Sequence, residues 1–285
     1  MRIPLVLAGA LLLLAGTACG ERVEPTGSLV AAYPVTVQGA ADRPAVLSAV
    51  PRRIVPLGAG TRGILKALGL ERRTVEVNDS LVGLPLVGAI RRARPDLIVA
   101  SNDTDPLDLA RARTATRAAV YVEPSNSLDD VVGAIGDIGL LTAEPVAARR
   151  VTAAIQRTRQ AVAGKLREAP TATVFVDTGD FSTVPSRSLL GDLIREAHGR
   201  SVAGPSPEPG PFPLRRLREL DPEVYLATRG SGRTLASLRS HTDTKRLRAV
   251  ESGRFGIVSM SAAPGPDIAQ TLAQIARILH PAAFR

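Results

Sequence analysis

The sequence predicts an α/β fold with two lobes joined by a single long helix. Residues 97–100 are too continuously apolar to alternate, as is typical of strands buried on both faces of a parallel sheet. One pattern occurs twice, at 92–103 and 218–229: a helix end, a proline, an acidic residue, an apolar strand and a polar loop. Between the two copies, residues 143–168 contain proline only at position 145, which a first helical turn tolerates. These observations predict two Rossmann-like lobes with the ligand cleft between them.

The first half of the chain alternates strands with short helices. Residues 61–70 predict a short helix whose apolar face is Ile64, Leu65 and Leu68. Apolar positions at helical spacing predict another helix over 127–141. The strands expected in this half lie within residues 31–38, 52–58, 74–77, 97–100 and 118–126.

The second half repeats this pattern after the long helix. Strands are expected within 171–180, after the proline of 218–229, and within 254–267. Helices are expected over 188–199 and from residue 268 to the proline near the end of the chain. The expected domains are therefore an N-terminal lobe at 31–142, a linking helix at 143–169 and a C-terminal lobe at 170–285.

The N-terminus has the three parts of a secretory signal peptide in residues 1–18: Arg2, an apolar run, and small residues at 16–18. The apolar run is too short for a confident membrane span, which needs about 20 apolar residues. Cys19 is the single cysteine of the chain, and "AGTAC" resembles the lipobox of bacterial lipoproteins. That resemblance implies lipidation of Cys19, with 19–30 as a tether and the protein anchored to the outer face of the cell membrane. An ordinary signal peptide cleaved nearby is the alternative.

Composition excludes several functions. The formal charge is +9, but the basic residues are scattered and aromatic residues make up only 3%, so we expect no nucleic-acid binding. One cysteine excludes a disulfide framework and a cysteine metal cluster. No G-x-S-x-G motif is present, and the three histidines do not share a loop with a pair of carboxylates. We therefore expect no catalytic residues, no metal site and no cofactor.

The stretch "GAGTRG" at 58–63 is the one motif that favours an enzyme. It matches the G-x-G-x-x-G fingerprint of dinucleotide binding, and Glu76 and Asp79 lie near where a ribose-binding acid would stand. The helix that follows has room for only two turns before Gly69, and export removes the protein from reduced nicotinamide. A nucleotide-dependent oxidoreductase is therefore the less favoured alternative.

Ligand-binding residues are expected in the loops that follow strands. Asp103 follows the strand at 97–100, although turn and helix-cap chemistry would also explain an aspartate there. Arginines occupy or border the other predicted strand-end loops, and guanidinium groups suit the oxygens of anionic chelates. These arginines are Arg62, Arg187, Arg229 and Arg233.

The ordered set of motifs resembles the solute-binding proteins of ABC importers, in the ferric-siderophore and cobalamin-binding branch. The stretches that carry the resemblance run from residue 31 to 281: "YPVTV", "VPRRIVPLGAGTRGILKALGL", "LPLVGAIRRARPDLIVASN", "LRELDPEVYLA", "LRAVESGRFGIVS" and "IARILHP". The resemblance implies a rigid two-lobe protein, expected here as a monomer, that holds an iron chelate or corrinoid in a shallow cleft for a membrane permease.

Two departures from that family concern its partner and its ligand. The family usually carries a glutamate on each lobe for docking to the permease, and here those positions hold Ala89 and Arg215. An orphan binding or sensor lipoprotein that docks no permease is therefore an alternative. Corrinoid pockets are expected to be rich in aromatic residues, yet the chain has no Trp, 3 Tyr and 5 Phe. A ferric siderophore is the favoured ligand, with a cobalamin-type corrinoid as the alternative.

Overall fold

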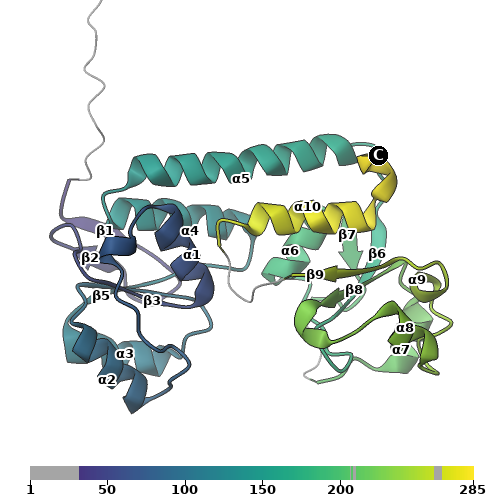
Figure 1. Cartoon of the computed structure of the whole chain (residues 1–285), viewed down its shortest axis with the longest axis horizontal. Coiled ribbons are helices and arrows are strands. Elements are labelled where there is room, and N and C mark those ends of the chain that lie inside the picture. The colour runs from purple at the N-terminus through teal and green to yellow at the C-terminus, as the bar shows by residue number, and fades with distance from the viewer. Residues whose placement is uncertain (1–31, 206, 208–209, 260–264) are drawn as a thin grey trace, which may run out of the picture.

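Two parallel sheets, one in each half of the chain, form the centres of two lobes (Figure 1). The computed structural model describes residues 32–205, 207, 210–259 and 265–285. The predicted signal peptide and Cys19 lie outside these residues. Within them, none of the helices combines the length and apolar character needed to cross a bilayer.

The N-terminal lobe is built on three parallel strands in the order β3-β4-β5. These strands are β3 (Ile54–Leu57), β4 (Leu97–Ala100) and β5 (Ala119–Val122). Every residue of β3 and β4 is buried, as expected for strands covered on both faces. A two-stranded antiparallel sheet of β1 (Val35–Val37) and β2 (Ala45–Leu47) lies beside them. The helices are α1 (Ala59–Ala67), η1 (Glu71–Arg73), α2 (Leu84–Ala93), α3 (Pro106–Thr116) and α4 (Leu128–Leu141).

The segment 74–77 does not form the strand that its alternating pattern predicts. A single parallel bridge joins Thr74 to Ile54, and the backbone N–H of Val75 donates to the carbonyl of Ile54 at 2.8 Å. The chain then leaves the sheet edge and passes over the end of β3, where the Asp79 carboxylate accepts a hydrogen bond from the Gly58 N–H at 2.9 Å. Tertiary contacts of this loop thus replace continued strand pairing.

The C-terminal lobe has a four-stranded parallel sheet in the order β7-β6-β8-β9. The strands are β6 (Ala172–Asp177), β7 (Gly199–Ser201), β8 (Val224–Thr228) and β9 (Phe255–Val258). The helices are α6 (Leu189–Glu196), α7 (Leu214–Leu220), η2 (Arg229–Ser231), α8 (Leu235–Ser240), α9 (Arg248–Glu251), α10 (Ile268–Leu279) and η3 (Pro281–Phe284).

Helix α5 (Pro145–Leu166) is 22 residues long and extends along both lobes, above α4 in one and α10 in the other (Figure 1). Pro145 stands in its first turn, where the missing N–H costs no helical hydrogen bond. Helix α4 begins sharply because Ser127 and Asp130 form a reciprocal capping box.

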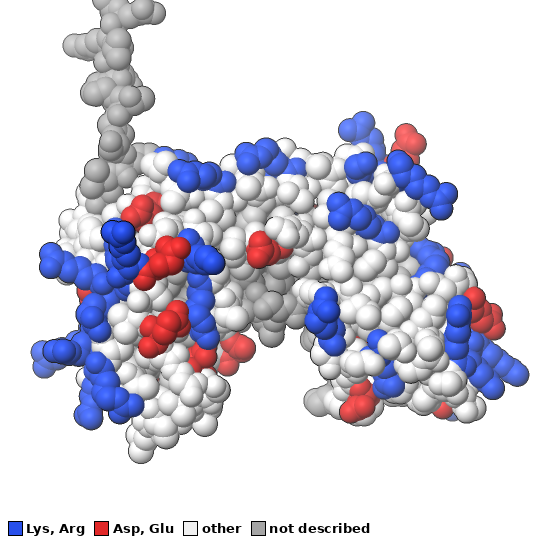
Figure 2. Space-filling model, viewed as in Figure 1, with Lys and Arg blue, Asp and Glu red and all other residues white. Residues whose placement is uncertain are grey.

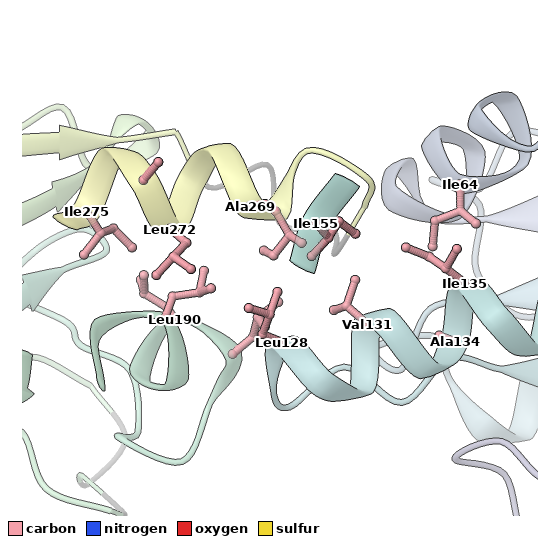
Figure 3. Close-up of a cluster of buried hydrophobic side chains, with 14 of the residues drawn as sticks. Ile64, Leu128, Val131, Ala134, Ile135, Ile155, Leu190, Ala269, Leu272 and Ile275 are labelled. Carbon is pink, nitrogen blue, oxygen red and sulfur yellow. The ribbon is translucent and has the colours of Figure 1, made fainter. Parts of the chain in front are cut away.

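One apolar core runs from the first lobe into the second through these helices. Figure 3 shows Leu128 and Val131 of α4 close to Ile155 of α5, with Leu272 of α10 and Leu190 of α6 continuing the contact into the C-terminal lobe. Burying each such side chain contributes about 1.5–3 kcal/mol. The lobes therefore share a core rather than being joined by a loose linker.

Candidate functional site

A hollow lies between the two lobes, below the bridging helices (Figure 2), and the loops after the strands of the two sheets lead towards it (Figure 1). In the N-terminal lobe these loops begin at Gly58, Ser101 and Glu123, after β3, β4 and β5. In the C-terminal lobe they follow β6, β8 and β9. Ligands of open parallel sheets bind at such strand ends.

A cavity of about 590 Å³ is lined from both lobes. Its lining includes Gly60 and Gly63 of α1, Ser259 after β9, and Thr271 and Gln274 of α10. Helix α1 lies close to the segment that leads into α10: a Cβ added to Gly63 would stand 3.4 Å from the Pro266 side chain.

The first glycine of "GAGTRG" has a structural explanation in the turn that follows β3. Gly58 has φ 122°, which disfavours other residues, and a Cβ there would lie 2.9 Å from the Cβ of Ser101. Gly63 allows close approach to the segment before α10. The backbone conformation and close packing at Gly58 therefore account for that glycine without a bound nucleotide.

Arg233 is held in a fixed orientation at the strand ends of the C-terminal lobe. Asp177, fully buried at the end of β6, accepts hydrogen bonds from the Tyr225 hydroxyl at 2.6 Å and from Arg233 Nε at 2.9 Å. The guanidinium carbon of Arg233 lies 4.0 Å from the centre of the Phe181 ring, in cation–π geometry. Burial and the hydrogen bond to Asp177 raise the pKa of Tyr225 well above its ordinary value, so its hydroxyl remains a donor.

The terminal nitrogens of Arg233 have no hydrogen-bond partner among the described residues, and its side chain keeps 20% exposure. An arginine that binds its own lobe through Nε has both terminal nitrogens left to receive a planar pair of oxygens. Arg233 is thus oriented before any ligand arrives.

The other two arginines predicted in this lobe are more exposed. Arg229 lies in η2, and its Nε and one terminal nitrogen donate to the Ser259 hydroxyl at 3.1 and 2.8 Å. Arg187 lies exposed in the loop before α6, with no ion pair among the described residues. All three predicted arginines of this lobe are therefore in strand-end loops or at their border.

The predicted residues of the N-terminal lobe have different surroundings. Arg62 forms a bidentate ion pair with Asp79 at 2.7 and 2.9 Å and lies 3.7 Å from Glu76, so its charge is already neutralised. Asp103 is exposed in the loop after β4, and its Oδ1 accepts a hydrogen bond from the Ser101 hydroxyl. The strand ends of this lobe are consequently acidic, in contrast to those of the C-terminal lobe.

Glu123 is a residue of this edge that the sequence analysis did not single out. It directly follows β5, is 1% exposed, and neither of its carboxylate oxygens has a hydrogen-bond partner among the described residues. Burial, with the charge of Asp103 adding to it and the Thr61 hydroxyl opposing, raises its pKa to about 8. Its carboxyl group is therefore mainly protonated at neutral pH. The sequence feature that could have identified Glu123 is the acidic residue that directly follows a buried strand in "YVEPSN".

Neither expected docking position carries a carboxylate. Ala89 is half-buried in α2, and Arg215 is exposed at the start of α7, where it pairs with Glu219 at 3.0 Å. Helices α2 and α7 lie at the ends of the two lobes, on the side away from α5 (Figure 1).

No family model matches the chain. A curated cobalamin-binding protein of Halobacterium salinarum is 24% identical to it over 275 residues, covering 87% of this chain and 74% of that protein.

Several solved structures share the fold over most of its length. CeuE of Helicobacter pylori, in a complex with nickel and histidine, has a TM-score of 0.75 at 14% identity, covering 88% of this chain and 89% of its own. The periplasmic vitamin B12-binding protein BtuF of Vibrio cholerae has a TM-score of 0.69 at 17% identity, covering 82% and 98%. An ABC-type Fe3+-hydroxamate transport protein of Saccharomonospora viridis has a TM-score of 0.68 at 16% identity, covering 87% and 99%.

These likenesses confirm the predicted α/β fold of two lobes and the resemblance to proteins of the ferric-siderophore and cobalamin-binding branch. The relatives are solute-binding proteins and not enzymes, in agreement with the prediction that the chain is not an enzyme.

Proposed function

We propose that the chain is an extracytoplasmic solute-binding protein that captures a ferric siderophore for an ABC importer. The fold shared with CeuE and BtuF and the sequence similarity to a cobalamin-binding protein support the general class of function. The fixed orientation of Arg233 is the observation that carries the choice of an anionic chelate.

Arg233 suits the oxygens of carboxylate, hydroxamate or catecholate groups. Its guanidinium is held by Asp177 and the Phe181 ring, so little side-chain freedom is lost when an anion binds. A hydrogen bond to a charged group contributes about 1.5–3 kcal/mol. Arg229 and Arg187 would add positive charge at the same edge, whereas we assign Arg62 a structural role because Asp79 already binds it.

A cobalamin-type corrinoid is the second candidate, favoured by the name of the Halobacterium salinarum relative. The chain offers few aromatic side chains for a corrinoid, with no Trp and only 3 Tyr. Two of those tyrosines, Tyr121 and Tyr225, are 0–1% exposed and donate their hydroxyls to Asp137 and Asp177, so neither presents a ring to a ligand.

A titration experiment separates these ligands. The purified chain is titrated calorimetrically with ferric trihydroxamates, ferric triscatecholates, cobalamin and haem. Arg233→Lys should weaken binding of an anionic ferric chelate about tenfold, because lysine has no planar fork. The matched control Arg157→Lys, on the exposed face of α5, should leave the affinity unchanged. Saturable binding of cobalamin alone would replace the siderophore assignment, and binding of none of the four would refute it.

The membrane anchor and the domain boundaries also belong to this proposal. Export through residues 1–18 and lipidation of Cys19 would place the two lobes on the outer face of the cell membrane, as a monomer, with 19–30 as the tether. Diacylation supplies the two-chain anchor that stable attachment needs. Cys19→Ala should release the protein into the medium with its ligand binding intact. Retention on the membrane would exclude Cys19 as the anchor.

The proposal includes pairing of the chain with the permease of an ABC importer. Position 89 holds alanine and position 215 holds arginine, so neither lobe carries a carboxylate where one is expected to dock the permease. An orphan binding or sensor lipoprotein is the function this observation favours if no importer pairs with the chain. Reconstituting the chain with a candidate importer and measuring ligand-stimulated ATP hydrolysis distinguishes the two roles.

A further inference from the structure

Helix α5 carries positive charge and no negative charge of its own. From Pro145 to Arg167 the sequence has six basic residues and no acidic one. Figure 2 shows basic side chains spaced along the side of the molecule where α5 lies in Figure 1. Acidic residues stand only beyond its ends: Glu144 precedes the helix and pairs with Arg73, and Glu168 follows it. No acid within the helix offsets its positive charge.

Four of these basic residues lie on the exposed side of the helix, and we call them the arginine face. Arg149 and Arg167 are 18 positions apart, about five helical turns, and therefore lie at the same angle around the helix axis. Arg150 and Arg157 are about two turns apart and lie within about 100° of that pair. All four are exposed. The buried residues of the helix are on the opposite side: Ala148, Ile155, Val162 and Leu166.

The arginine face has no anionic partner in the described part of the chain. There, the ion pairs of α5 involve only Arg159, which binds Asp129 and Glu196, each at 2.7 Å. Lys165, the remaining basic residue, lies 5.3 Å from the centre of the Phe284 ring. Like charges gathered on one side of a helix repel one another, so an anionic surface would stabilise this face.

The other exposed positions of α5 carry small or polar side chains, apart from Val146 in the first turn. They are Ala153, Ala154, Gln160, Ala161, Ala163 and Gly164. A protein interface normally contains a central cluster of aromatic or large apolar anchors, which this side of the helix lacks. Guanidinium groups on long stems bind phosphate oxygens, and lipid headgroups rearrange to meet them. The arginine face therefore fits phosphodiester headgroups better than a protein partner.

The described part of the chain begins beside the start of this helix. The Tyr33 hydroxyl donates to the carbonyl of Leu141 at 2.8 Å, and α5 begins four residues after Leu141. Strand β1 packs on α4, near the start of α5 (Figure 1). Cys19 stands 14 residues before Tyr33, and a chain of that length spans at most about 50 Å. An anchor at Cys19 would hold the start of α5 within that distance of the bilayer.

We propose that α5 lies on the membrane surface and binds anionic lipid headgroups through the arginine face. The inference rests on the anchoring of Cys19 in the proposed function and adds an orientation to it. The hollow between the lobes is on the side of the molecule away from α5, so it opens away from the bilayer, towards the arriving ligand (Figure 2). Helices α2 and α7 also face away from the bilayer, so transfer to a permease requires the chain to turn over (Figure 1).

Vesicle binding tests the headgroup contact without the lipid anchor. The Cys19→Ala chain is sedimented with vesicles of phosphatidylcholine, or of phosphatidylcholine and phosphatidylglycerol in equal parts. It should bind the anionic vesicles and not the neutral ones. Binding should weaken as salt is added, because screening acts over about 10 Å at 0.1 M salt. This contact alone is reversible, so the Cys19→Ala chain still leaves the cell.

A fourfold variant assigns that binding to the arginine face. Each basic residue near an anionic surface strengthens binding about fivefold, so losing three such contacts should weaken it about hundredfold. Glutamine keeps the length and helix propensity of the side chain without its charge. The variant is R149Q/R150Q/R157Q/R167Q.

A matched control removes the same charge from the far ends of the lobes. Its four arginines lie on α2, on α8 and just before α9, all exposed and without an ion pair among the described residues. It should bind the anionic vesicles within about threefold of the Cys19→Ala chain, since its arginine face is intact. Circular dichroism melting establishes that both variants remain folded. The control is R91Q/R92Q/R239Q/R246Q.

A fluorophore reports which side of the molecule meets the bilayer. Cys19 is the single cysteine, so the Cys19→Ala chain accepts one label at a chosen position. Ala153→Cys places the label among the arginines of α5, and Ala236→Cys places it on exposed α8. The emission of a polarity-sensitive label should shift to shorter wavelength with anionic vesicles at position 153 and stay unchanged at position 236.

Each outcome separates this inference from the proposed function. No binding of the Cys19→Ala chain to anionic vesicles would overturn the headgroup contact and favour an acidic protein as the partner of this face. Equal weakening by both fourfold variants would overturn the assignment to α5, because binding would then follow net charge alone. A shift at position 236 and not at 153 would overturn the orientation. Both fourfold variants should keep the affinity for a ferric siderophore, and binding of no ferric chelate by any of these chains would overturn the proposed function instead.

Discussion

Replacing Glu123 by glutamine should stabilise the protein at neutral pH. Burial raises the pKa of Glu123 to about 8 in the folded chain, against an ordinary value of 4.5 in the unfolded chain. Between these two pH values the unfolded state releases a proton that the folded state retains. The contribution of Glu123 to stability is therefore complete below pH 4.5 and is lost progressively as the pH rises towards 8.

The size of this loss follows from the difference between the two pKa values. Each pH unit between them changes the free energy of unfolding by about 1.4 kcal/mol. Between pH 5 and pH 7.5 the unaltered chain should lose about 3 kcal/mol relative to Glu123→Gln, which has no proton to release. Glutamine keeps the shape of the protonated carboxyl group, so packing beside Thr61 should be preserved.

Urea unfolding at pH 5 and pH 7.5, followed by far-ultraviolet circular dichroism, measures this difference. Subtracting the variant from the unaltered chain removes the pH dependence of all other groups. Glu219→Gln, which neutralises an exposed carboxylate paired with Arg215, serves as the control and should follow the unaltered chain. If the stabilities of Glu123→Gln and the unaltered chain change in parallel between the two pH values, Glu123 is not protonated in the folded state and the reasoning fails.

Three further substitutions test the packing of the fold, each by the same urea experiment at one pH. Gly58→Ala should cost about 1–3 kcal/mol, because φ is 122° and the new Cβ would stand 2.9 Å from Ser101; an unchanged midpoint would contradict that geometry. Ser127→Ala should cost about 1 kcal/mol by removing the cap of α4, whereas Ser127→Asp should retain most of the stability. Leu272→Ala should cost about 2–5 kcal/mol because the side chain is fully buried between the lobes, and a loss below 1 kcal/mol would argue against a shared core.

Local pattern was sufficient to predict most strands and helices of this fold. The run 97–100 is apolar because β4 is the central strand of its sheet, and a proline two residues before it ends the preceding helix. The first-turn position of Pro145 likewise agrees with the observed start of α5. The strand predicted over 74–77 is wrong, because its residues pair with β3 only at Thr74 and the loop then places Asp79 at the Gly58 N–H. Strands β2 and β7 and helix α3 were not predicted.

The partners of the site residues could not be predicted in the same way. Arg62 is paired by Asp79, 17 positions away, and Arg233 is oriented by Asp177, 56 positions away. Neither spacing is a helical or strand repeat, so no periodicity reveals it. Sequence reasoning could place arginines and Asp103 near strand ends, but which of them is already neutralised depends on contacts between distant loops.

The apolar core that continues from α4 through α5 and α10 to α6 has a kinetic consequence for ligand exchange. With the lobes packed on common helices, we expect the spacing between the strand ends of the two lobes to change little when a ligand binds. Association should then depend on diffusion and orientation, with the arginines at the strand ends of the C-terminal lobe orienting an anionic ligand as it approaches. Residence time is then the quantity that we expect side-chain substitutions at these strand ends to change.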